Sequence, residues 1–318
     1  MLRVLLLLGL VLVARSSGAA ELRLFTFGAG EVGGGYFASA TTVCEAVNRV
    51  NRGTLRCSPE ATPGSLYNLT SLRDGQLDFA LTQSDWQKAA YEGSRFFASA
   101  GPMSDLRAVM SLYPEAITIL ARSGSGIAQV TDLVGKRVDI GPPASGRRAT
   151  VVRVLTDLDL DRTDFRALLE LPTDSHFGEL CAGRIDASIL VMGHPSESLA
   201  EVMQRCGAAL VPLSGPRVDA LLQEGSDFVP VTIPSGDYPG LAADVPTYAV
   251  IATVVTRDDV PTDIVEAMVA ATLDDLDQLG IRAPVLTGLE PMAMRSRGLM
   301  VPLHPGALAA FGAYAGPP

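Results

Sequence analysis

The chain has 318 residues, 47% of them hydrophobic, and its many glycines and prolines follow no repeat. This composition can bury a full core in one large domain or two medium ones, and it excludes a disordered or fibrous chain. The formal net charge of −10 argues against nucleic-acid binding, which requires a basic face.

Residues 1–20 have the three parts of a secretory signal peptide. Arg3 gives a positive start, residues 4–13 are apolar, and residues 16–20 are small. The apolar run is too short to span a bilayer, so we expect cleavage near Ala20 and export to the periplasm. A buried N-terminal helix is the weaker alternative, because Arg15 ends the run without an amphipathic period. Loss of two arginines and no acid would take the net charge from −10 to −12.

The first third of the mature chain alternates between strand and helix patterns. The expected elements are strands at 22–27, 55–60 and 77–82, helices at 36–50 and 65–73, and a glycine-rich turn at 28–35. The helix at 65–73 is predicted from leucines at helical spacing. This order predicts parallel strands with crossover helices.

The alternation continues through the rest of the chain. We expect strands at 106–112, 116–121, 137–140, 185–191, 209–213 and 246–256, and helices at 130–134, 147–158, 261–279 and 306–314. Tyr113-Pro114 separates the first two of these strands, and 219–238 is expected to be irregular. The fold class is therefore α/β, with two mixed sheets flanked by helices, a hinge and a central cleft. We place lobe I at 21–115 and 257–318, and lobe II at 116–256, which includes the returning strand.

Four cysteines fit an oxidising compartment. No Cys-x-x-Cys pair is present, which argues against zinc or thioredoxin-type chemistry. Two disulfides are expected, and three connectivities are possible. We favour Cys44 with Cys57 and Cys181 with Cys206, because each pair brackets one helix-to-strand connection. Four buried free thiols are the alternative.

Residues 28–33 match the G-x-G-x-x-G pattern of dinucleotide sites directly after a strand. The acidic partner is expected about twenty residues further on, and Glu60 comes too late. We therefore expect no cofactor, and interpret these glycines as allowing close approach to a small ligand. His176, His194 and His304 are too far apart in sequence to favour a metal site or a catalytic triad.

Two polar segments are candidates for ligand contact. Residues 83–86 follow the third strand, where polar groups would line a cleft, although Ser84 or Asp85 could also cap a helix. Residues 145–148 open a helix in lobe II. An arginine beside free backbone N–H groups would hold a carboxylate, and the alternative is a solvated helix arginine.

Short motifs run in order along nearly the whole mature chain, at 28–36, 60–65 with 67–68, 77–86, 90–93, 112–115, 124–127, 132–138, 141–148 with Thr150, 193–195 and 302–306. Together they resemble the TAXI family (TRAP-associated extracytoplasmic immunogenic proteins). These are the solute-binding subunits of tripartite ATP-independent periplasmic (TRAP) transporters.

The resemblance implies a type II-like periplasmic binding protein that closes its lobes on a small anionic solute. The solute would be a dicarboxylate such as 2-oxoglutarate or an acidic amino acid such as glutamate. The protein would be a monomer without catalysis, and its partners would be the TRAP membrane subunits, driven by an ion gradient. The cysteines would pair locally, as in relatives. The implied ligand contacts are Gly30, Gly34, Tyr36, Gly64, Ser65, Gln83, Ser84, Asp85, Trp86, Tyr113, Pro114, Glu115, Ser145, Gly146 and Arg148.

The chain departs from the family at three loops. Ala38, Pro63 and Ala144 stand where relatives usually have proline, glycine and glycine, and Phe37 replaces a tyrosine. These changes could alter which ligand fits. Two other functions remain open: a secreted enzyme acting on a small acid with Asp85 as base, and a sensor partner that presents its ligand to a receptor.

Overall fold

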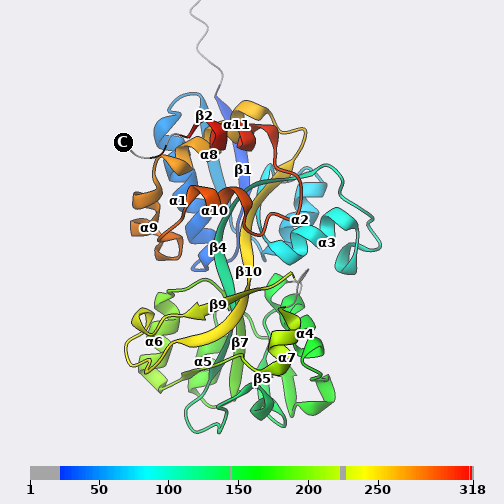
Figure 1. Ribbon diagram of the computed structural model, residues 1–318, viewed down its shortest axis with the longest axis vertical. Helices are drawn as coiled ribbons and strands as arrows, with labels where there is room; N and C mark the ends of the chain where they lie inside the picture. Colours follow the sequence, from blue (N-terminus) through cyan, green and yellow to red (C-terminus); the bar gives the residue numbers. More distant parts are fainter. Residues whose placement is uncertain (1–21, 144, 223–226, 315, 317–318) are drawn as a thin grey trace, which may run out of the picture.

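The computed structural model describes residues 22–143, 145–222, 227–314 and 316, and the expected signal peptide at 1–20 lies outside them. Two bodies of strands and helices lie one above the other in Figure 1, joined by the long strands β4 and β10. The α/β, two-lobed fold expected from the sequence is confirmed. Among the helices of the described part, none is long and apolar enough to cross a membrane.

The strands form one hydrogen-bonded sheet in the order β2-β1-β3-β10-β4-β7-β5-β6, with β8 on β4 and β9 on β10. β1 is parallel to β2 and β3, as expected, and β10 is antiparallel to β3 and β4. The two expected sheets share β4 and β10, which make them continuous. The strands are β1 Arg23–Gly28, β2 Leu55–Glu60, β3 Phe79–Gln83, β4 Leu106–Ala121, β5 Arg137–Asp139, β6 Ala167–Leu169, β7 Ala187–Met192, β8 Ala209–Val211, β9 Val229–Ile233 and β10 Val245–Arg257.

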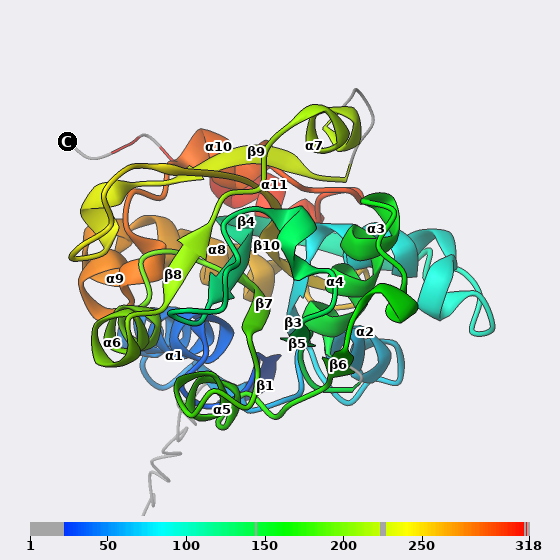
Figure 2. The ribbon, with the colours of Figure 1, turned by 90° about the horizontal axis from the view of Figure 1, so that it is seen from below.

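Helices cover the sheet in both lobes (Figures 1 and 2). The α-helices are α1 Gly35–Val50, α2 Ser65–Arg73, α3 Ser84–Glu92, α4 Gly146–Asp157, α5 His176–Cys181, α6 Glu197–Cys206, α7 Pro216–Leu221, α8 Thr262–Leu273, α9 Leu276–Arg282, α10 Pro291–Ser296 and α11 Pro305–Ala313. The 3₁₀ turns are η1 Arg95–Phe97, η2 Val130–Leu133, η3 Arg162–Asp164, η4 Ser235–Asp237 and η5 Pro284–Leu286.

The expectation of two strands separated by Tyr113-Pro114 is wrong, because β4 is one strand from Leu106 to Ala121. Pro114 lies opposite Ile251 of β10, and the register of this pair shifts between Ile251 and Thr253. Proline lacks an N–H and is tolerated where ladder pairing is irregular. The proline therefore marks an irregular point within a strand that passes from one lobe to the other.

Three other expectations need correction. The helix expected at 261–279 is divided into α8 and α9, and the segment 219–238, expected to be irregular, contains the end of α7 and all of β9. β6, α5 and α6 were not expected. These elements are short, and a short apolar run has too few repeats to show a period.

Each lobe has its own core. The clusters of lobe I come from residues 25–113 and 252–311, with Phe27, Phe79 and Met268 fully buried. Those of lobe II come from residues 116–250 and include Ile119 and Leu199. Along β4 the buried residues pass from the core of lobe I to the core of lobe II between Tyr113 and Ala116, and along β10 they pass back between Val250 and Ala252. The exact lobe limits given above stay a prediction.

The cysteines form the two local disulfides favoured from the sequence. Cys44–Cys57 joins α1 to β2, and Cys181–Cys206 joins the ends of α5 and α6. Closing loops of this size removes conformational freedom from the unfolded chain, worth about 3 kcal/mol per bond on the chain-entropy model.

Candidate functional site

Three helices of lobe I begin at the same edge of the sheet. α1, α2 and α3 follow β1, β2 and β3, and parallel strands bring their carboxyl ends together. The residues before these helices are Gly34, Gly64 and Gln83, and none of them caps its helix through a side chain. Gly64 has a φ of 104°, which favours glycine. Uncapped helix N-termini leave backbone N–H groups free and carry partial positive charge.

Helix α4 of lobe II begins against this edge. Gly146 lies so close to lobe I that a β-carbon there would clash with Gln83 Oε1 and would lie 2.8 Å from Ser65 Oγ. Ser145 caps α4, accepting a hydrogen bond from the Arg148 backbone N–H. Figures 1 and 2 both show α4 beside α3. The two lobes are thus in direct contact where the helices begin.

Thr150 extends this contact by one helical turn. Its hydroxyl donates to Asp85 Oδ2 at 3.1 Å and accepts from Trp86 Nε1 at 3.0 Å. Burial raises the pKa of Asp85 to about 6, although Arg153 and Arg95 oppose the shift. Asp85 Oδ1 is buried and has no hydrogen-bond partner among the described residues.

An ion cluster lies beside Thr150. Asp227, which precedes β9 in lobe II, is 2.8 Å from Arg153 of α4, 2.6 Å from Arg95 and 3.1 Å from Lys88. Lys88 and Arg95 belong to lobe I. Burial alone would raise the pKa of Asp227, but hydrogen bonds from Arg95 and Lys88 lower it below its ordinary value. The buried carboxylate therefore joins cations of both lobes.

A tyrosine–glutamate pair lies where β4 passes between the lobes. The Tyr36 hydroxyl donates to Glu115 Oε2 at 2.7 Å, and Glu115 is 6% exposed. Burial raises the pKa of Glu115 from its ordinary value of 4.5 to about 8, against the hydrogen bond from Tyr36. The buried Tyr113 hydroxyl lies against Gly35, at the start of α1, and has no hydrogen-bond partner among the described residues.

The two arginines that begin α4 have different environments. Arg148 forms an ion pair with Glu170 at 2.7 Å, within lobe II. The side chain of Arg147 is 12% exposed, and its Nη2 lies 2.5 Å from Asp139 Oδ2. Burial lowers the pKa of Arg147 below its ordinary value. Two acids oppose the shift, namely Asp139 in the same lobe and Glu31 in lobe I. The solvated-arginine alternative is therefore wrong for Arg147.

The expected ligand contacts fall into three groups, and their binding roles stay predictions. Those at the lobe contact, in the tyrosine–glutamate pair or beside that pair are Gly30, Tyr36, Ser65, Gln83, Asp85, Trp86, Tyr113, Glu115 and Gly146. Gly34, Gly64 and Ser145 precede helices. The others make different contacts: Ser84 Oγ accepts from Ile251 N, Pro114 pairs with Ile251, and Arg148 pairs with Glu170.

Sequence reasoning did not include Arg153, Asp227 or Thr150 among the ligand contacts, although Thr150 lies in one of the motifs that carry the resemblance. A signal was present for two of them, because Gly146, Thr150 and Arg153 recur at helical spacing and share one face of α4. Asp227 had no such signal, since its cations come from distant parts of the chain.

The histidines lie in separate buried contacts. His194 bonds to Tyr238 and Thr118, His176 to Ser188, and His304 caps α11. Within the described ranges, no group of three His, Cys, Asp or Glu residues could hold a metal ion.

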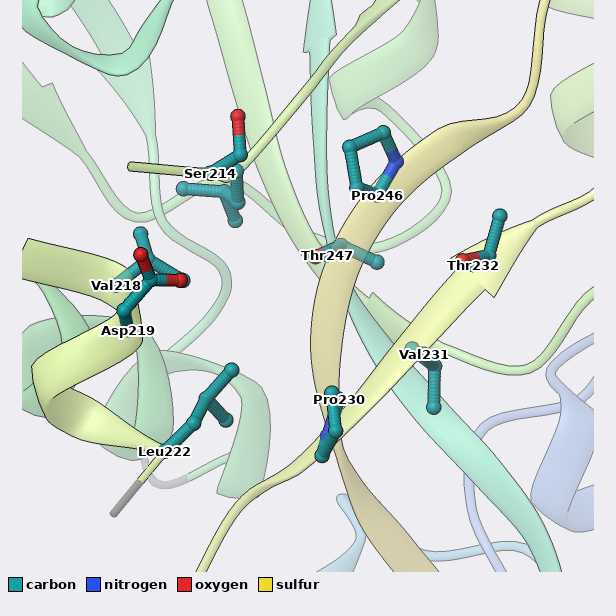
Figure 3. Close-up of a pocket in the computed structure, with 10 residues that line it drawn as sticks. Ser214, Val218, Asp219, Leu222, Pro230, Val231, Thr232, Pro246 and Thr247 are labelled. Carbon is teal, nitrogen blue, oxygen red and sulfur yellow. The ribbon is translucent and has the colours of Figure 1, made fainter. Parts of the chain in front are cut away.

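A surface hollow of about 390 Å³ lies in lobe II between α7 and β9. Figure 3 shows Asp219 of α7 and Leu222 directly after it on one side, and Pro230 and Thr232 of β9 on the other. All its lining residues belong to lobe II, so a molecule held there would not bridge the lobes. The lobe contact is therefore the stronger candidate.

Comparisons with known proteins agree with the two-lobed fold. The model of the NMT1-like family matches residues 27–312. MatC from Rhodopseudomonas palustris, solved with bound malate, is 14% identical, with a TM-score of 0.56 over 84% of this chain and 90% of that one. A periplasmic sulfonate-binding protein from Methylobacillus flagellatus KT is 14% identical, with a TM-score of 0.50, and the match covers 82% of this chain and 70% of that one. The ligand-binding component of an ABC-type import system from Staphylococcus aureus, with zinc bound, is 12% identical, with a TM-score of 0.50. This match covers 84% of this chain and 80% of that one. At these identities the likeness concerns the fold.

Proposed function

The chain belongs to the NMT1-like family, and from this premise we propose that it is a periplasmic solute-binding protein. It captures a small anionic solute by closing its two lobes and delivers it to membrane subunits of a transporter. It catalyses no reaction and needs no cofactor.

The observation that carries this proposal is the set of uncapped helix N-termini where the lobes meet. α1, α2 and α3 begin at one sheet edge without side-chain caps, and α4 begins opposite them. Free N–H groups at helix starts bind carboxylates and other anions. The uncapped starts of α1, α2 and α3 lie in lobe I, and in the start of α4 in lobe II Ser145 caps only the Arg148 N–H. An anion held by groups of both lobes favours the closed arrangement by its differential affinity.

The finer assignment is to the TAXI family, with TRAP membrane subunits as partners and the ligand contacts given in the sequence analysis. It rests on the ordered motifs of the mature chain. The ligand class is a dicarboxylate or an acidic amino acid, and the malate bound by MatC is a dicarboxylate. Residues 1–20 direct the protein to the periplasm, where it acts as a monomer.

A ligand screen tests the binding function. The mature protein is mixed with small organic acids and acidic amino acids, and its thermal unfolding is followed. A ligand at one hundred times its dissociation constant should stabilise the fold by about 2.7 kcal/mol. Native mass spectrometry should show one intact ligand per protein. Turnover of the ligand, or no stabilisation by any small anion, would contradict the proposal.

Transport by reconstituted membrane subunits tests the partner assignment. With the binding protein outside and its membrane subunits in vesicles, labelled solute should accumulate under an ion gradient without ATP. Accumulation that requires ATP would refute the TRAP assignment and leave the solute-binding function intact.

A further inference from the structure

Among the buried acidic side chains of the described residues, Glu115 differs from the others in its distance from basic side chains. Four acidic side chains are buried, namely Asp85, Glu115, Asp139 and Asp227. Three of these have an arginine within 4.0 Å: Arg153 lies 3.9 Å from Asp85, Arg147 lies 2.5 Å from Asp139, and both Arg95 and Arg153 contact Asp227. Within the described part of the chain, no basic side chain forms an ion pair with Glu115, and its hydrogen-bond donor is the neutral hydroxyl of Tyr36.

An unpaired buried carboxylate is costly, because burial removes its hydration and nothing replaces it. The group must either hold a proton or receive a cation from outside the chain. The titratable groups that face Glu115 are Tyr36 from α1, Tyr113 from the same strand and Asp85 from α3. None of them can supply a positive charge. A bound ligand is therefore the available source of one.

The surroundings of Glu115 fit a ligand that carries both charges. Tyr36, which donates to Glu115, is the second residue of α1. The uncapped start of this helix is thus one tyrosine side chain away from the carboxyl group and offers N–H groups to an anion. The Tyr113 hydroxyl lies 3.0 Å from the position of a β-carbon at Gly35 and is buried without a hydrogen-bond partner among the described residues. A donor, an acceptor and a helix start are therefore grouped within one small region.

We propose that Glu115 holds the protonated amino group of the ligand, so that the solute is an amino acid and not a dicarboxylate without an amine. This inference rests on the proposed function. The ligand carboxylate binds at the helix N-termini, and its ammonium group pairs with Glu115. Glu115 then acts as the specificity-determining residue, because a keto or hydroxyl group at the same position has no positive charge, so that Glu115 keeps its proton and forms no ion pair with the ligand.

Matched ligands test the inference by calorimetry. L-Glutamate is compared with 2-oxoglutarate, and L-aspartate with L-malate, so that an oxygen group replaces the amine in each pair. The amino acid of a pair should bind at least tenfold more tightly. Glu115 holds a proton before binding and loses it when the ammonium arrives, so titrations at pH 7 in buffers of different ionisation enthalpy should show about one proton released per amino acid. The proton count uses the natural protein and does not depend on a variant.

Glu115→Gln provides the second arm. It keeps an acceptor for Tyr36 but cannot become negative, so affinity for the amino acid should fall about 10- to 100-fold. Affinity for the matched oxo or hydroxy acid should change less than about twofold. Glu45→Gln, an exposed change on α1, is the matched control and should alter neither ligand.

Three results would overturn the inference and leave the proposed function standing: equal affinity within both pairs, no proton release, or equal effects of Glu115→Gln on both classes. If neither class binds, the proposed function fails, and the inference fails with it.

Discussion

Asp227 of lobe II lies 2.6 Å from the guanidinium of Arg95 of lobe I, and the same carboxylate is 2.8 Å from Arg153 of its own lobe. The Asp227 side chain is 5% exposed, whereas the two arginines are 34% and 25% exposed. The cluster therefore holds a buried anion between Lys88 of α3, Arg153 of α4 and the segment before β9. It connects the lobes beside Trp86, because the Arg95 guanidinium lies 5.9 Å from the centre of the Trp86 ring.

Asp227→Asn should favour the open arrangement, because the neutral amide no longer attracts cations from both lobes. We expect ligand affinity to fall by about 5- to 150-fold, the equivalent of 1–3 kcal/mol. The change is measured by ligand dissociation followed through the fluorescence of Trp86, the single tryptophan of the chain. Asp186→Asn is the control, since Asp186 pairs with Arg122 and Arg137 inside lobe II. An unchanged dissociation rate in Asp227→Asn would exclude a role in closure.

Thr150→Val should remove the two hydrogen bonds that the Thr150 hydroxyl makes with Asp85 and Trp86. The buried carboxylate and indole N–H then lose their partner, at a cost of about 1–3 kcal/mol in the closed arrangement. Calorimetry of ligand binding gives the effect. Thr150→Ser keeps the hydroxyl and should restore most of the affinity. If serine were as poor as valine, the methyl group, and not the hydrogen bonds, would matter.

Gly146→Ala should hinder closure without unfolding lobe II. The added β-carbon meets Gln83 and Ser65 across the lobe contact, and overpacking of this kind costs about 1–3 kcal/mol. Ligand should bind more weakly, and small-angle X-ray scattering should show less compaction on ligand addition. At Gly178 of α5 a β-carbon meets nothing within 4 Å, so Gly178→Ala is the matched control. Full compaction of Gly146→Ala on ligand addition would show that lobe closure does not need the close approach of Gly146 to lobe I.

Glu115 should make the ligand-free protein less stable as pH rises. Burial raises its pKa to about 8, so between the ordinary value near 4.5 and about 8 the unfolded chain has lost this proton while the folded protein keeps it. The folded state binds more protons in this window, and stability therefore falls with pH, by up to about 1.4 kcal/mol per pH unit from this group. Above about pH 8 the contribution is constant.

Urea unfolding between pH 4 and 9 tests this slope. Glu115→Gln removes the titrating group. The free energy of unfolding of this variant should therefore fall less steeply between pH 5 and 8, and the difference in slope should correspond to about one bound proton. Glu45→Gln should retain the natural slope. Parallel stability curves for Glu115→Gln and the natural protein would mean that Glu115 titrates normally.

Much of lobe I could be predicted from the sequence. The strand at 55–60 and the helix at 65–73 have the predicted bounds, because alternation and leucine spacing are local signals. The starts of α1 and α4 were predicted within one residue, since glycine-rich loops precede both. The local disulfides were favoured among three possible connectivities, and the structure decided between them. The strands and helices of this part depend on neighbours in the chain, and the sequence determines them directly.

Tertiary structure decided which charges meet. Arg147 and Arg148 are adjacent, but side chains one residue apart on a helix point in different directions. The way α4 packs buries Arg147 against Asp139 and leaves Arg148 with Glu170. Likewise, Glu115 differs from the other buried acids only through which cations the fold brings near it. The sequence determined the local elements and their order, whereas contacts between residues far apart in the chain depend on how those elements pack, and a local pattern carries no record of that packing.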